Sequence, residues 1–164
     1  ITWFQLFDTK IAIVPVLKNL LNQAIGIAAM QVGITENPAN SNRGEKVDEY
    51  LRRTGLNPVG NNYSWCAAFV YYCFDEASKS LAQSNPLYKT AGVLNHWNKS
   101  TARQIKPAEA QANLSLLIPG TIFIINHGQG LGHTGIIERV DGGNLITIEG
   151  NTNPQRSRNG YGVY

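Results

Sequence analysis

The chain has 164 residues, of which 43% are hydrophobic and 15% are charged, and its net charge is +3. This composition supports a packed core and excludes a chain that is disordered throughout. No apolar run reaches the ~18 residues that a membrane-spanning helix needs, so we expect no insertion into a membrane. The small positive charge does not demand an acidic partner. Because the sequence contains no block of basic residues, we expect no binding to nucleic acid.

Helical patterns fill the first part of the chain. Apolar residues recur at helical spacing before a loop that is rich in turn formers. Asn42 and Glu45 then have the spacing of a capping box, and Gly55 followed by Pro58 marks the end of a helix. Ser64 is a suitable N-cap for the next helix. The predicted helices span residues 16–33, Asn42 to Gly55, 65–80 and 91–99.

The pattern changes from helices to strands after Leu117. A Pro-Gly turn introduces the first apolar strand, and the turn Asp141-Gly142-Gly143 joins the second strand to the third. Helices that precede antiparallel strands favour an α+β fold, with the helices packed on one face of the sheet. The predicted strands span residues 119–126, 133–140 and 144–151, with a fourth expected at 160–164.

The two cysteines, Cys66 and Cys73, both fall in the third predicted helix. Their spacing along a helix separates the Cα atoms by ~10.5 Å, whereas a disulfide requires less than ~7 Å, so both should be free thiols. Cys66 lies at the helix start, where free N–H groups and the helix dipole stabilise a thiolate. Cys73 lies in the middle of the helix, where it is expected to be a small buried hydrophobe. Cys66 is therefore the candidate nucleophile.

A cysteine nucleophile needs a histidine within hydrogen-bond reach, and three are present. His96 has no evident orienting partner, and His127 has the pattern of an exposed loop residue. His133 opens a strand directly after a glycine-rich loop. The following strand carries Glu149 and Asn151, whose side chains project from one face and which are suited to orient an imidazole. A Cys, a His and a polar orienting residue in this order are typical of papain-like enzymes.

Four sequence blocks resemble the CHAP family, the cysteine, histidine-dependent amidohydrolases/peptidases of the NlpC/P60-like superfamily. The resemblance covers about residues 25–164. We therefore expect an N-terminal extension at residues 1–15, outside the family pattern, and a CHAP-like catalytic domain at 16–164 with a papain-like fold. The blocks are Trp65-Cys66-Ala67-Ala68-Phe69-Val70, Pro119-Gly120-Thr121, Gly132-His133-Thr134-Gly135-Ile136-Ile137-Glu138 and Ile148-Glu149-Gly150-Asn151-Thr152.

The resemblance implies hydrolysis of an amide bond in bacterial peptidoglycan, by an amidase or an endopeptidase. By motif match, Cys66 would be the nucleophile, His133 the base, Glu149 the residue that orients the base, and Asn151 an accessory polar residue. No cofactor is implied. The cysteines and histidines also lack the spacing of a zinc site, so we expect no metal.

An oxyanion forms when the thiolate attacks a carbonyl, and it requires hydrogen-bond donors. The backbone N–H of Cys66 is one candidate donor, and Asn62 or Tyr63 in the preceding loop is the other. Trp65 is a further candidate for substrate contact, by stacking on a glycan ring, although an aromatic residue at this position also suits the core.

Two other function classes remain open. One is a non-catalytic module that binds the cell wall or a partner through the same fold. The other is a thiol acyltransferase, which passes the acyl group to an amine instead of to water. A hydrolase of this kind would act at the wall after secretion, in the periplasm or after delivery by a phage. If it acts as a toxin, an immunity or inhibitor protein is the expected partner.

Overall fold

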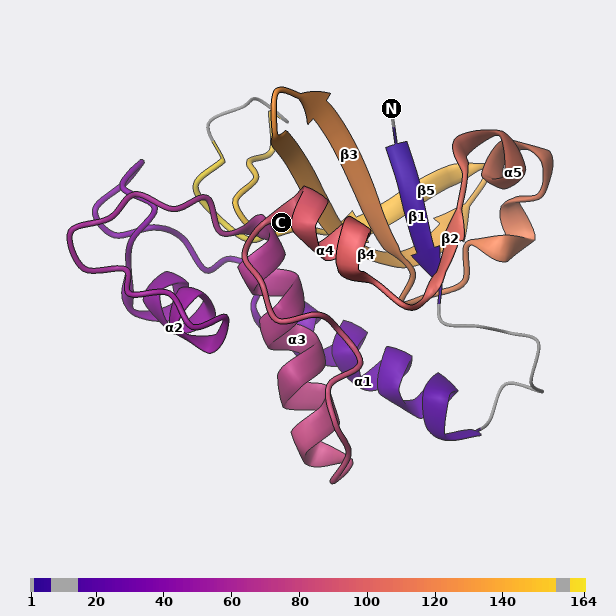
Figure 1. The fold of residues 1–164 in the computed structure, drawn as a ribbon, viewed down its shortest axis with the longest axis horizontal. Helices are drawn as coiled ribbons and strands as arrows, with labels where there is room; N and C mark the ends of the chain where they lie inside the picture. Colours follow the sequence, from indigo (N-terminus) through magenta and orange to yellow (C-terminus); the bar gives the residue numbers. More distant parts are fainter. Residues whose placement is uncertain (1, 7–14, 156–159) are drawn as a thin grey trace.

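The computed structural model of the chain describes residues 2–6, 15–155 and 160–164. Within this part a helical layer packs against an antiparallel five-stranded sheet of order β2-β1-β3-β4-β5 (Figure 1), which confirms the α+β prediction. The helices are α1 (Pro15–Met30), α2 (Glu45–Arg53), α3 (Cys66–Ser80), α4 (Val93–Lys99) and α5 (Pro107–Ala112), with a 3₁₀ turn η1 at Leu114–Leu116. The strands are β1 (Thr2–Leu6), β2 (Arg103–Ile105), β3 (Ile122–Gly128), β4 (Leu131–Asp141) and β5 (Asn144–Ile148).

The four predicted helices are present, but both predicted side-chain caps are wrong. Gly44 is the N-cap of α2 and Trp65 is the N-cap of α3, and neither helix start has a side-chain cap hydrogen bond. Asn42 is instead held in a left-handed turn with φ 52°, and its backbone N–H donates to the Glu36 carboxylate at 3.0 Å. Ser64 lies one position outside the cap of α3 and is exposed. Tertiary contacts thus override the local capping preference of these side chains.

Helix α3 is the centre of the fold. It packs against α1, α2 and β4 (Figure 1), and most of its residues are buried, because the helix is apolar on nearly every face. The sheet contributes Ile122, Ile124 and Ile136 to this core, while Phe123 belongs to a second cluster on the opposite face, as the period of two in a strand requires. Helix α5, which we did not predict, contributes Ala110 to that second cluster.

Residues 2–6 join the sheet, although they fall within the predicted N-terminal extension. Strand β1 lies between β2 and β3, and Phe4 is paired with Ile105 on one side and with Phe123 on the other. Thr2 also lines the cavity described below. Pro15, the last residue of the predicted extension, begins α1, whereas residue 1 and residues 7–14 lie outside the described residues. The boundary at residue 15 stays a prediction.

The three predicted strands are present as β3, β4 and β5, and the Asp141-Gly142-Gly143 turn joins the last two. Gly142 and Gly143 both have positive φ, 54° and 82°, as a tight hairpin turn requires. The fourth predicted strand is only a set of backbone bridges. Gly162 pairs with Thr35 and Thr152, and Tyr164 exchanges two backbone hydrogen bonds with Glu149, at 2.9 and 3.1 Å. No helix among the described residues has the length and hydropathy needed to cross a bilayer.

Candidate active site

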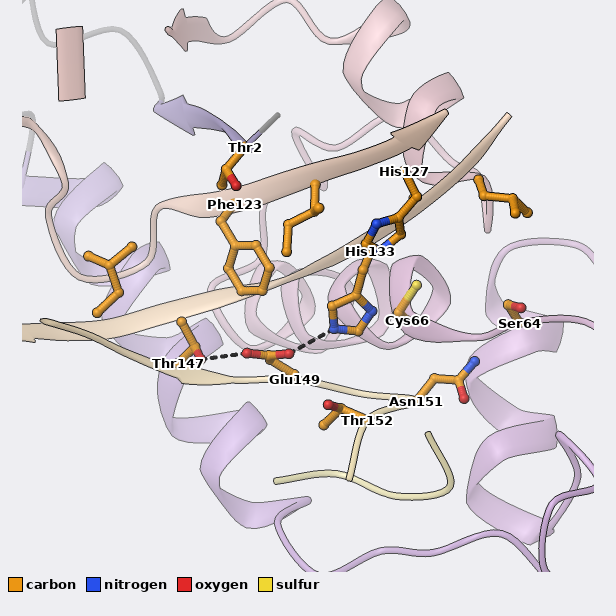
Figure 2. Close-up of a pocket in the computed structure, with 14 residues that line it drawn as sticks. Thr2, Ser64, Cys66, Phe123, His127, His133, Thr147, Glu149, Asn151 and Thr152 are labelled. Carbon is orange, nitrogen blue, oxygen red and sulfur yellow. Dashed lines mark hydrogen bonds and ion pairs between the residues drawn. The ribbon is translucent and has the colours of Figure 1, made fainter. Parts of the chain in front are cut away.

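Cys66 lies at the first position of α3 and lines a cavity of about 490 Å³ (Figure 2). The cysteine is a free thiol, as predicted, and only 3% of its surface is exposed. Because no side chain caps α3, the backbone N–H groups of the first turn are not used by a cap residue. Such a helix start stabilises negative charge.

His133 projects from β4 into the same cavity and lies between Cys66 and Glu149 (Figure 2). Its Nε2 is 2.7 Å from Oε2 of Glu149, so Nδ1 is the nitrogen that is left for Cys66. Cys66 lies beside the imidazole (Figure 2), and its side chain is one of the groups that raise the pKa of His133. The fold therefore assembles the thiol, the imidazole and the carboxylate that the sequence analysis selected.

The environment of His133 favours a protonated imidazole. Burial by itself lowers the pKa of His133, but hydrogen bonds and charge interactions with Cys66 and Glu149 outweigh it and raise the pKa from 6.5 to about 10. At neutral pH this arrangement supports a protonated imidazole beside Cys66. An imidazolium next to a thiolate is the reactive state of a cysteine nucleophile.

Glu149 is fixed from three directions. Thr147 donates a hydrogen bond from Oγ1 to Oε1 of Glu149 at 2.6 Å, while Oε2 is near His133. The backbone of Glu149 is paired with Tyr164. Gly135 on β4 leaves the space for the carboxylate side chain, since a Cβ at that position would lie 2.7 Å from Cγ of Glu149. Our sequence analysis missed Thr147, although its position two residues before Glu149 on a strand indicates the same face.

Asn151 lies at the edge of the cavity, but its hydrogen bonds run to the start of α3. Its φ is 55°. With its side-chain amide turned to the orientation that satisfies both neighbours, the oxygen accepts from the backbone N–H of Trp65 at 3.1 Å and the nitrogen donates to the carbonyl of Gly160 at 2.8 Å. Gly150 before it passes directly against α3, where a Cβ would lie 2.6 Å from Phe69. Asn151 thus connects the segment after β5 to the residue that precedes the nucleophile.

The three predicted substrate-contact residues occupy different environments. Trp65 is fully buried and donates from Nε1 to the Glu36 carboxylate at 2.9 Å, so its ring packs in the core and is not available for stacking on a glycan. Asn62 is exposed, and its side-chain oxygen accepts a hydrogen bond from Asn42 at 2.5 Å. Tyr63 is half-buried and lines a second cavity next to Cys66.

The remaining histidines are placed differently. His96 is buried, its Nε2 lies 2.9 Å from Oε1 of Gln5, and burial lowers its pKa to about 4. His127 is exposed but lines the Cys66 cavity, at a point where the β3–β4 register shifts between Asn126 and Gly128. Such a bulge redirects a side chain next to a site. Among the described residues no group of three or more His, Cys, Asp or Glu side chains is arranged to hold a metal ion.

The two thiols should react at very different rates. Cys73 is fully buried, and burial raises its pKa well above the usual range, whereas Cys66 lines an open cavity beside His133. We expect iodoacetamide near pH 7 to alkylate Cys66 at least about 100-fold faster than Cys73, measured by peptide mass spectrometry over time. Similar rates for both thiols would contradict activation of Cys66.

A helix-borne thiol that faces a strand-borne histidine defines a papain-like cysteine site. The family model of the CHAP domain matches residues 58–151, which is more than half of the chain, and the chain therefore belongs to the CHAP family. CHAP domains are typically hydrolases that act on peptidoglycan. No curated protein and no solved structure matches the chain.

Proposed function

We propose that the protein hydrolyses an amide bond of bacterial peptidoglycan, as an N-acetylmuramoyl-L-alanine amidase or as an endopeptidase of the stem or cross-bridge. The observation that carries the proposal is the position of His133, with Glu149 on Nε2 and Cys66 on the other side of the ring. This geometry is suited to acyl transfer through a thioester, and peptidoglycan is the substrate class that family membership supports.

In the first half of the reaction the Cys66 thiolate attacks the carbonyl carbon of the scissile amide. The electron pair of the carbonyl moves to its oxygen, and the tetrahedral oxyanion collapses as the C–N bond breaks. His133 gives its proton to the departing nitrogen, which leaves as an amine. Glu149 holds the imidazole in the orientation that this transfer needs and stabilises its protonated form.

In the second half a water molecule attacks the thioester. Neutral His133 accepts the proton of that water, the C–S bond breaks, and a carboxylic acid and the Cys66 thiolate are released. The product acid loses its proton to the solvent. The site then returns to the ion pair of thiolate and imidazolium.

The start of α3 is the best source of hydrogen-bond donors for the oxyanion. The backbone N–H of Cys66 lies on the first turn of a helix that has no side-chain cap, and an N–H in that position is a preorganised donor. Tyr63 is the better supported second donor, because it lines a cavity that reaches Cys66. Asn62 is engaged with Asn42 and lines neither of the two cavities next to Cys66.

The alternatives differ from this proposal in what happens to the acyl group. A binding module needs no reactive thiol, so the grouping of Cys66 beside the His133–Glu149 pair favours catalysis. An acyltransferase uses the same first half-reaction and differs only in the acceptor.

We further propose that the enzyme acts at the cell wall, after secretion, in the periplasm or after delivery by a phage. In a toxin role, an immunity protein would act by covering the cleft.

The test is digestion of purified sacculi of several wall chemotypes by the wild type and by Cys66→Ala. Mass spectrometry of the soluble fragments identifies the bond from the new termini. Fragments that depend on Cys66 and end in a free carboxylate and a free amine support hydrolysis. Fragments that carry a new amide to an added amine indicate a transferase. A folded wild type that releases nothing from any wall would favour the binding module.

A further inference from the structure

A second cavity of about 410 Å³ adjoins Cys66, and apart from Tyr63 its lining residues have no role in the steps above beyond Cys66 itself. It has in common with the first cavity the residues Ser64, Cys66, Leu131 and Gly132. The two cavities therefore meet at Cys66. An extended substrate that crosses Cys66 occupies both of them, one on each side of the scissile bond.

The two cavities differ in charge. The first is lined by His127, His133 and Glu149, whereas none of the residues that line the second is charged. The walls of the second cavity come from the loop before α3, from the start of α4 and from the tip of the β3–β4 hairpin. Their apolar side chains are Leu56, Tyr63, Ala91, Val93 and Leu131.

Leu131 is the most informative of these residues. It is 57% exposed, and it lies where both cavities meet. Gly132 beside it is confined, since a Cβ there would lie 3.0 Å from Cγ1 of Val93. The hairpin thus presents an apolar surface to whatever lies next to the sulfur.

The position of His133 determines which part of the substrate lies on which side. The imidazole must reach the departing nitrogen to protonate it, and His133 lines the first cavity but not the second. The amine part therefore belongs to the first cavity. The acyl part, which becomes the thioester, belongs to the second.

We propose that the second cavity is an acyl-side subsite that selects an uncharged group on the carbonyl side of the scissile amide. The inference rests on the proposed thiol mechanism and narrows the set of amide bonds that the enzyme can cleave. A charged group placed among these apolar walls would lose hydration without gaining a partner. Bonds whose carbonyl comes from alanine, glycine or the lactyl group of muramic acid are accepted. Bonds whose carbonyl comes from a glutamate with a free carboxylate, or from a diamino acid with a free amine, are rejected.

The test uses covalent probes, because they report on this subsite without wall hydrolysis. N-acetyl-aminoacyl chloromethyl ketones carry the side chain on the carbonyl side, and Cys66 forms a thioether with their methylene carbon as chloride leaves. We compare alanyl, glutamyl and lysyl probes, each as both enantiomers. Each rate of Cys66 alkylation is divided by the rate of the same probe with N-acetylcysteine. At least one alanyl enantiomer should react at least about tenfold faster than every glutamyl and lysyl probe.

Two variants examine the subsite directly. Ala91→Asp places a carboxylate on the wall of the second cavity and should raise the lysyl rate relative to the alanyl rate by about tenfold. Thr90→Asp is the second variant. The side chain of Thr90 accepts a hydrogen bond from the Gly92 N–H, and an aspartate at this position can accept the same hydrogen bond. The control is Met30→Asp, at an exposed position that lines neither cavity, and it should leave all rate ratios unchanged.

The outcomes separate this inference from the proposed function. Equal corrected rates for the alanyl and charged probes would overturn the subsite, even if the wild type cuts sacculi. Selective alkylation without release of wall fragments would overturn the proposed function and leave the subsite in place. If no probe alkylates Cys66 faster than it alkylates N-acetylcysteine, the thiol is not activated and both are overturned.

Discussion

Replacing Cys66 by alanine should lower the release of wall fragments by at least about 10⁴-fold, because loss of a catalytic nucleophile removes the covalent pathway. The fold should persist. The Cys66 side chain lines a cavity and carries no cap or disulfide, so its loss should change the free energy of unfolding by about 1 kcal/mol or less. Single-turnover digestion of sacculi and thermal unfolding measure the two quantities.

Cys73→Ala is the matched control on the same helix. Cys73 is fully buried in the core, so truncation should reduce the free energy of unfolding by about 1 to 2 kcal/mol while turnover is retained. Cys66→Ala should thus lose turnover and keep its stability, whereas Cys73→Ala should keep turnover and lose stability. A folded Cys66→Ala protein that still releases fragments at the wild-type rate would refute the nucleophile assignment.

Glu149→Gln should lower kcat/KM by about tenfold or more near neutral pH, through the orientation and charge state of His133. The carboxylate contributes to the raised pKa of His133 by a hydrogen bond and by its charge, and the amide removes the charge. The pKa of His133 should therefore fall in the variant. Because His133 must be protonated to release the amine, the alkaline limb of the pH profile of kcat/KM should move to lower pH.

The pH dependence of stability gives a second measurement of the same interaction. The folded pKa of His133, about 10, lies above its ordinary value of 6.5, so the folded state binds this proton more tightly. The stabilisation is complete below pH 6.5 and is lost as the pH rises through about 10. Glu149→Gln should reduce this slope in the free energy of unfolding, which denaturant titrations at several pH values measure.

Glu138→Gln is the control for charge. Glu138 lies on β4, as His133 does, but it is paired with Arg139 at the surface. This variant should leave both the pH profile and the slope of stability with pH unchanged. An unaltered alkaline limb in Glu149→Gln, or an equal effect of both variants, would show that Glu149 does not set the charge state of His133.

The sequence was most informative where periodicity and chemistry coincide. The placement of Cys66 at a helix start, of His133 on one strand and of Glu149 at the end of the next followed from local patterns, and the structure brings them together. Strand periodicity also pairs Thr147 with Glu149, but that signal became useful only once Glu149 was known to accept a hydrogen bond.

The features that were not predicted depend on contacts between distant residues. The Glu36 carboxylate accepts hydrogen bonds from the backbone N–H of Asn42 and from the indole N–H of Trp65. These contacts hold Asn42 away from the predicted N-cap position and keep the tryptophan ring buried. Strand β1 is stabilised by pairing with β2 and β3, and five residues alone carry too little pattern to reveal this. The second cavity is formed by three separate loops, so no local pattern indicates it.

The nucleophile is carried by the helical layer and the base by the sheet, and these two residues come together where β4 packs on α3 (Figure 1). Neither layer alone contains a reactive centre. During refolding, helices and hairpins form from local contacts before distant segments meet. Rapid alkylation of Cys66 should therefore return later than the circular dichroism signal of the helices. Cys66 is thus a built-in chemical reporter of the moment at which the two layers dock.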